Sequence, residues 1–262
     1  MRGTDKGSAS EEKLLYAKID DMKEKARRGR TAASAFLTPS EIFLASEYLR
    51  RSVKEFDYAF LGGYEDAERK MLVIFPDYIL PEYFDTDEVF RAVMIKASGH
   101  VELDHKAYLG SLMGLSVKRE TIGDIVLIPE GAVVFCTLPV ADMLCGHECP
   151  LERVGRDKVS VFYADKDICA NFSREYEEMS VIMASLRLDC AVAALSNVSR
   201  AVAQDKITSG DVRLRYKEEF SPSAQISAGD VLSVRGVGKF IIGDICGETR
   251  SGRQRISVKR YV

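Results

Sequence analysis

The sequence lacks the patterns that define several common classes of protein. In its 262 residues, no apolar run approaches the roughly 18 residues that a membrane-spanning helix needs. The N-terminus carries early charges and no hydrophobic segment, so we expect no secretory signal. The six cysteines show no framework spacing, which favours reduced thiols in a cytoplasmic protein. The length allows two or three small domains.

The motifs of common catalytic and metal sites are also missing. The three histidines do not supply the His-rich, ATP-binding signature of a tyrosyl-tRNA synthetase, and no Gly-rich cofactor loop follows a strand and opens a helix. A zinc site at Cys145-Gly146-His147-Glu148-Cys149 would need four ligands, and the usual Cys-x-x-Cys pairs are absent. Small apolar cysteines near a helix end explain this segment better. We therefore expect no metal, no cofactor and no catalytic residue.

Charge is distributed unevenly along the chain. The net charge is −3, but residues 180–262 hold 13 Lys and Arg against eight Asp and Glu, a balance of +5. The preceding residues must then carry −8. A basic C-terminal module on an acidic body directs a polyanion to one end of the molecule.

The N-terminal region, residues 1–88, reads as an α/β region. Residues 11–28 predict a helix, and Thr38 with Glu41 forms a capping box that starts a second helix reaching about Lys54. Strands are expected at 56–60 and 71–75. The intervening Gly62-Gly63 favours a hairpin over a phosphate-cradling loop, which would need a different glycine spacing.

The central region, residues 89–175, predicts the order β-α-β-β-α-β of the split ferredoxin-like plait. The expected strands are 89–97, 122–128, 132–138 and 158–164, and the expected helices are 104–115 and 139–145. RNA recognition motifs share this RRM-like fold, but their stacking aromatics are not evident here. A scaffold role and direct RNA contact both remain open. In the loop before residue 122, Lys118 and Arg119 either contact RNA or satisfy carbonyls of the preceding helix.

The C-terminal module, residues 180–262, follows a linking segment at 171–184, which is acidic at 175–178 and strand-like at 181–183. Leu188, Val192 and Leu195 bury one helical face, which leaves Arg187 free to reach outward. Ser199 caps a second helix, so Arg200 lies in its first turn, where a bound phosphate would offset its unfavourable interaction with the helix dipole. Lys206 extends this polar surface. Arg235 and Lys239 flank a glycine-containing turn that a nucleic-acid backbone can approach closely.

These residues carry a resemblance to a known domain and to a known family. Five segments resemble the S-four RNA-binding domain, or alpha-L motif. They are Ser185-Leu186-Arg187-Leu188-Asp189, Ser199-Arg200, Gly210-x-Val212, Gly229-Asp230 and Arg235-Gly236. The upstream segments 61–70, 104–113 and 117–124 resemble the YlmH family of bacterial proteins. Their sequences are LGGYEDAERK, DHKAYLGSLM and VKRETIGD.

The resemblance implies a ribosome-associated protein that binds rRNA and tRNA and is not an enzyme. Family members associate with the large ribosomal subunit carrying peptidyl-tRNA, in rescue and quality control of stalled translation, and an earlier naming tied them to cell division. The implied RNA-facing residues are Arg187, Ser199, Arg200, Lys206, Arg235 and Lys239. Where relatives commonly have Asn, this chain has Arg215, which can substitute a phosphate contact. Lys118 and Arg119 are possible second contacts.

Two other functions stay open at this stage. S-four domains also accompany RNA-modifying enzymes, so the chain could be such an enzyme or its accessory subunit acting on rRNA or tRNA. The acidic body could also serve as an adaptor for a protein partner factor, which is compatible with RNA binding.

Overall fold

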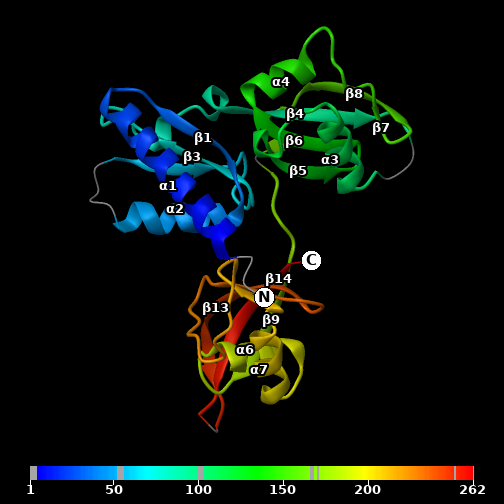
Figure 1. The fold of residues 1–262 in the computed structure, drawn as a ribbon. Helices are drawn as coiled ribbons and strands as arrows, with labels where there is room; N and C mark the ends of the chain where they lie inside the picture. Colours follow the sequence, from blue (N-terminus) through cyan, green and yellow to red (C-terminus); the bar gives the residue numbers. More distant parts are fainter. Residues whose placement is uncertain are drawn as a thin grey trace. The chain divides into compact units, whose positions relative to one another are not determined.

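The chain forms two compact units, Met1–Ser173 and Arg174–Val262, in a computed structural model. The structure describes residues 5–51, 56–99, 103–165, 168–169, 171–250 and 252–261. Both units combine helices with antiparallel sheets, so the predicted α+β class is confirmed (Figure 1). Within these ranges, no helix is long and apolar enough to cross a membrane.

The first part of the N-terminal unit packs two helices on a three-stranded antiparallel sheet of order β1-β3-β2. The capping box is formed as predicted, since Thr38 N donates to Glu41 (2.7 Å) and Glu41 N donates to Thr38 Oγ1 (3.3 Å). The predicted end near Lys54 lies outside the described residues. The elements are α1 (Asp5–Arg27), β1 (Ala32–Leu37), α2 (Pro39–Arg51), β2 (Tyr58–Leu61) and β3 (Lys70–Ile74).

The second part of this unit is a five-stranded antiparallel sheet of order β5-β6-β4-β8-β7. Helices α3 and α4 share one hydrophobic core with it, in which Tyr108, Leu112 and Leu144 are buried. The elements are β4 (Phe90–Ala97), α3 (His105–Gly114), β5 (Ile122–Ile128), β6 (Gly131–Thr137), α4 (Leu138–Cys145), β7 (Arg153–Val154) and β8 (Asp157–Tyr163), with short 3₁₀ turns η1 (Pro81–Tyr83), η2 (Thr86–Glu88) and η3 (Arg119–Thr121). The six elements expected in this region all occur within a few residues of their predicted bounds.

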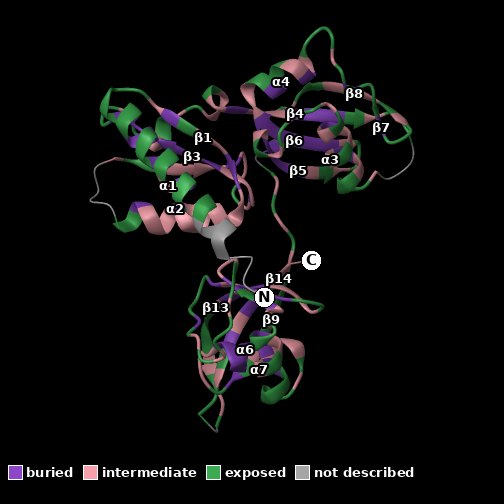
Figure 2. Ribbon diagram, in the orientation of Figure 1, coloured by how far each residue is buried: buried purple, intermediate pink, exposed green. Residues whose placement is uncertain are grey.

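The other face of the second sheet is covered by the first part of the unit. Phe36 and Met71 join Phe90, Val133 and Phe135 in one buried cluster. In Figure 2, buried stretches of β4 and β6 are purple. The hairpin at Gly62-Gly63 packs directly on this face. Gly63 has φ +92°, and a Cβ there would lie 2.1 Å from the Phe135 ring, so only glycine fits.

The C-terminal unit is a six-stranded antiparallel sheet of order β11-β10-β12-β13-β14-β9, with α6 and α7 against one face. The segment predicted to link the domains instead forms β9, which pairs with β14 along its whole length. This sheet therefore begins before the predicted start at residue 180. The elements are β9 (Tyr176–Met183), α6 (Leu188–Ser196), α7 (Arg200–Thr208), β10 (Val212–Leu214), β11 (Lys217–Glu218), β12 (Val231–Val234), β13 (Gly238–Glu248) and β14 (Gln254–Tyr261).

Candidate nucleic-acid interface

A fully buried carboxylate organises the helical side of the C-terminal unit. Asp189 lies in the first turn of α6 with no exposed surface. Arg187 donates to both of its oxygens (3.1 and 3.0 Å), and Arg200, from the start of α7, donates twice to Oδ2 (3.0 and 2.8 Å). Gln204, one turn further along α7, donates to the same oxygen at 3.2 Å. One acidic side chain therefore joins the N-termini of two helices.

The charged groups of this cluster differ in their exposure to solvent. Burial by itself raises the pKa of Asp189, but the hydrogen bonds from Arg187, Arg200 and Gln204 outweigh it and hold the pKa well below its usual range. The carboxylate is therefore ionised at neutral pH. The Arg187 side chain is 35% exposed and that of Arg200 is 54% exposed. The cluster thus presents two guanidinium groups at the surface, in fixed positions, over a single buried negative charge.

Two details of this region differ from the sequence-based expectation. Arg187 is not free to reach outward, because its guanidinium is paired with Asp189. Asp189 itself was not among the predicted site residues, although the Arg-Leu-Asp spacing was the available signal. Ser199 does cap α7, accepting a hydrogen bond from Val202 N at 3.3 Å. The cap holds the first turn of α7, and with it Arg200, beside α6.

The other predicted cations of the C-terminal unit lie at separate places. Lys206 is in the last turn of α7, and Arg235 is strongly exposed in the turn after β12, 3.5 Å from Asp211. Lys239 flanks the same turn, as predicted, and is the second residue of strand β13. It lies on the sheet face away from the helices, because its neighbour Phe240 points into their core.

Arg215 occupies a backbone position that suits asparagine. It has φ +52° and the next residue, Tyr216, has φ +66°, in the tight turn between β10 and β11. Its guanidinium binds Asp230 in a two-pronged ion pair, with distances of 2.6 and 2.7 Å. This ion pair offsets the strain of the positive φ at Arg215. It also occupies the guanidinium that was predicted to contact a phosphate.

Of the two cations predicted in the N-terminal unit, Arg119 is turned inward and Lys118 is exposed. Arg119 donates to the carbonyl oxygens of Ile122 (2.6 Å) and Gly123 (3.3 Å). Burial lowers its pKa, which reflects a guanidinium partly withdrawn from water. Arg119 thus satisfies carbonyls at the start of β5, the following strand, whereas the alternative to RNA contact had placed them on the preceding helix. Lys118 precedes the turn η3.

A second carboxylate explains why the motif segments 61–70 and 117–124 occur together. Asp124 accepts hydrogen bonds from Tyr64 Oη (2.7 Å), Glu68 N (2.7 Å) and Arg69 N (3.0 Å). The Arg69 guanidinium, in turn, donates to the carbonyls of Ile122 (3.0 Å) and Phe36 (2.8 Å). These two motifs therefore meet and fasten the first part of the N-terminal unit to the second.

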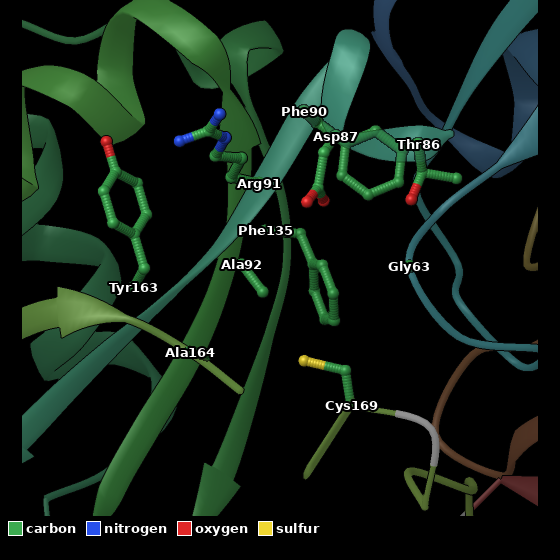
Figure 3. Close-up of a pocket in the computed structure, with 10 residues that line it drawn as sticks. All are labelled: Gly63, Thr86, Asp87, Phe90, Arg91, Ala92, Phe135, Tyr163, Ala164 and Cys169. Carbon is green, nitrogen blue, oxygen red and sulfur yellow. The ribbon is translucent and has the colours of Figure 1, made fainter. Parts of the chain in front are cut away.

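The same unit contains a cavity of about 420 Å³ beside β4 (Figure 3). Phe90, Phe135, Asp87 and Cys169 surround the hollow, and Arg91 lies beside the ring of Tyr163. Burial raises the pKa of Cys169 to about 11, so its thiol is protonated at neutral pH and a poor nucleophile.

The cysteine and histidine segment at 145–149 shows no metal-binding geometry. In the part of the chain that the structure describes, no group of three or more His, Cys, Asp and Glu side chains is placed to hold a metal ion. Burial raises the pKa of Cys145 to about 11, which favours the thiol over the thiolate that a metal requires.

Comparison with known proteins places the central sheet in a class of RNA-binding domains. The family model described as "Putative RNA-binding domain in YlmH" matches residues 89–167, the span from β4 to β8. The Bacillus subtilis (strain 168) protein named "Ribosome-associated protein quality control protein P2" is 32% identical over 232 residues, which is 88% of each chain. The chain belongs to the YlmH family, as its motifs predict.

A solved structure adds a likeness of fold. It is titled "Cell division protein ylmH from Streptococcus pneumoniae" and is 17% identical, with a TM-score of 0.50. The match covers 62% of this chain and 95% of that chain.

Proposed function

We propose that the chain is an RNA-binding protein that anchors to the ribosome through its C-terminal unit. The observation that carries this proposal is the pair Arg187 and Arg200, held by one buried Asp189 and exposed to solvent at two helix N-termini. Partly exposed guanidinium groups held in fixed positions suit phosphate oxygens. Ser199, Lys206, Arg215, Arg235 and Lys239 belong to the proposed RNA-binding set, and Lys118 extends it on the other unit.

The C-terminal unit is proposed to be an S-four domain. Two short helices with a Ser-capped second helix, followed by a Gly-led strand and an Arg-Gly turn, support this reading. Arg119 belongs to the proposed RNA-binding set only as a structural neighbour of Lys118, because its guanidinium is bound to carbonyls of β5.

The central sheet is proposed to be a ferredoxin-like, RRM-like plait that serves as a scaffold. The strand order β5-β6-β4-β8 and the two helices on one face support the plait. An RNA recognition motif stacks bases on its open sheet face. Here Phe36 and Met71 pack on that face, which favours the scaffold role over direct base stacking. The division into domains 1–88, 89–175 and 180–262 stays a prediction.

The cellular role is proposed to be rescue or quality control of stalled translation in the bacterial cytoplasm. The name of the Bacillus subtilis relative, which is 32% identical, supports ribosome association and quality control. The large subunit, its rRNA and peptidyl-tRNA are the proposed partners. We further propose that the chain binds without catalysing a reaction and needs no cofactor.

Sedimentation through sucrose gradients tests this function. We expect wild-type protein in bacterial extract to travel with large ribosomal subunits at low salt and to dissociate as salt rises. Arg200→Ala should leave most of the protein at the top of the gradient, whereas the matched control Arg50→Ala, on the exposed side of α2, should sediment as wild type. Protein that ignores ribosomal particles and ribosomal RNA at low salt would overturn the proposal.

A further inference from the structure

A row of aromatic and cationic side chains crosses the C-terminal sheet on the face away from α6 and α7. Residues that alternate with it, such as Phe240 and Val258, are buried toward the helices, which places Lys239 and Lys259 on the opposite face. In register, Lys239 lies across from Ser233 and Tyr261 lies across from Tyr176. The row therefore spans strands β13, β14 and β9.

Each tyrosine of this row lies within reach of a cation. Lys239 Nζ is 4.1 Å from the centroid of the Tyr261 ring and 5.5 Å from that of Tyr216. Lys259 Nζ is 5.6 Å from the Tyr176 centroid, and the Arg174 guanidinium is 5.5 Å from the Tyr261 centroid. The rings of Tyr176 and Tyr261 meet edge to face, with centroids 5.3 Å apart. Three partly exposed rings and three cations thus form one continuous cluster.

This combination of groups matches the chemistry of an unpaired nucleotide. Flat rings stack on bases of any sequence, and neighbouring cations contact the phosphates between the bases. A double helix cannot use such rings, because its bases are already stacked and paired. The unit that carries the cluster, residues 174–262, has a net charge of +3, which favours a polyanion as its partner.

We propose that this sheet face, defined by Tyr176, Tyr216, Tyr261, Lys239 and Lys259, binds an unpaired segment of RNA by base stacking. The inference rests on the proposed RNA-binding function and extends it. Arg187 and Arg200 act on the helical side, and the tyrosine row gives the same unit a second contact with single-stranded RNA. Lys239, predicted from sequence as a phosphate contact, acts here beside Tyr261.

The test measures binding of the full chain to a fluorescein-labelled RNA strand of about eight nucleotides, a site size typical of one small domain. The same strand in a perfect duplex serves as the comparison. Tyr261→Ala should weaken single-strand binding about tenfold, the usual effect of losing one stacked base, and should leave duplex binding unchanged. Tyr261→Phe keeps the ring and should bind within about twofold of wild type.

A second variant, Tyr176→Ala, and a crosslinking experiment on the wild-type protein keep the test decisive if Tyr261→Ala does not fold. With a 4-thiouridine strand and wild-type protein, ultraviolet crosslinks should map to peptides containing Tyr176 or Tyr261. Crosslinks confined to α6 and α7, with Tyr261→Ala binding the single strand as wild type, would overturn this inference and leave the proposed function standing. Loss of all RNA and ribosome binding by the wild-type protein would overturn both. Displacement of the strand by an acidic peptide, without crosslinks to the row, would indicate a protein partner instead.

Discussion

Each of the two units contains an aspartate that accepts several hydrogen bonds, Asp124 in the N-terminal unit and Asp189 in the C-terminal unit. The donors that bind the two aspartates differ in kind. In the N-terminal unit, Asp124 binds backbone N–H groups and the Tyr64 hydroxyl, while the nearby Arg69 and Arg119 point inward to carbonyl oxygens. In the C-terminal unit, Asp189 binds the guanidinium groups themselves, and these remain partly exposed.

The difference decides which arginines are available to a polyanion. Arg119 has its guanidinium occupied by carbonyls and a pKa lowered by burial, so a phosphate would have to displace existing hydrogen bonds. Arg200 keeps 54% of its side chain exposed and bonds a carboxylate beneath it. A phosphate can approach Arg200 from the solvent side. Adjacent cations in a sequence therefore do not by themselves define a binding surface.

The largest effect is expected from Asp189→Asn, which removes the charge and keeps the size of the side chain. We expect the free energy of unfolding to fall by about 2–3 kcal/mol, the range for hydrogen bonds to a charged group. RNA affinity should fall with it, because Arg187 and Arg200 lose their common anchor. Urea titration and filter binding measure the two losses.

Asp124→Asn is the matched comparison for this substitution. It should also destabilise the protein, because it weakens the attachment between the two parts of the N-terminal unit, but RNA affinity under native conditions should stay at the wild-type level. Equal loss of RNA affinity in both variants would contradict the distinction between the clusters.

The next effect is expected from Arg200→Ala. Arg200 is half exposed, but its partner Asp189 is buried and keeps Arg187 and Gln204, so the loss in stability should be about 1–2 kcal/mol, below that of Asp189→Asn. RNA affinity should fall about tenfold, which corresponds to about 1.4 kcal/mol of lost phosphate contact. Filter binding with large-subunit RNA and a thermal melt of the same preparation give both numbers. A variant that loses stability but binds RNA as wild type would reverse the role given to Arg200.

Arg119→Ala should show the opposite pattern, with a smaller effect. It removes the donor to the Gly123 carbonyl and one of two donors to the Ile122 carbonyl, which keeps its bond from Arg69, so we expect a loss of about 1 kcal/mol in stability. RNA affinity should stay within about twofold of wild type, or about 0.4 kcal/mol. The same two assays apply, and an RNA defect as large as that of Arg200→Ala would show that the segment at 117–124 contacts RNA directly.

The smallest expected effect is the pH dependence of the difference in stability between wild type and Asp189→Asn. Burial raises the folded-state pKa of Asp189, but its arginine partners outweigh burial and lower that pKa. The stabilisation that ionised Asp189 gives the folded protein is therefore fully present above the unfolded pKa of about 3.9. It is lost as pH falls through the folded pKa. The stability difference between wild type and Asp189→Asn should thus be constant from pH 7 to about 4 and shrink below it. A difference that shrinks already between pH 7 and 5 would contradict the lowered pKa.

Local sequence signals predicted much of the fold. The capping box at Thr38 and the element order of residues 89–164 were readable, because both depend on short-range spacing. Strand β9 was readable only at its apolar end, residues 181–183, since its acidic stretch at 175–178 resembles a linker until β14 pairs with it. The sheet thus begins at Tyr176, and the domain bound at residue 180 stays a prediction.

The candidate site was less accessible from sequence. The capping role of Ser199 follows from local pattern, but the partner of Arg187 and Arg200 is set by how α6 and α7 pack. The same limit applies to Lys239, whose contact with Tyr261 joins the start of β13 to the end of β14. Tertiary contacts of this kind leave no periodic trace in the sequence.

The salt dependence of RNA binding tests the central claim most directly. Each phosphate contact contributes about 0.7–0.9 to the slope of log affinity against log salt concentration. Measured side by side on the same large-subunit RNA, Arg200→Ala should lower that slope by about one contact, and Arg119→Ala should leave it unchanged. A slope that is unchanged in Arg200→Ala, or lowered equally in Arg119→Ala, would contradict the assignment of the Asp189 cluster as the RNA anchor.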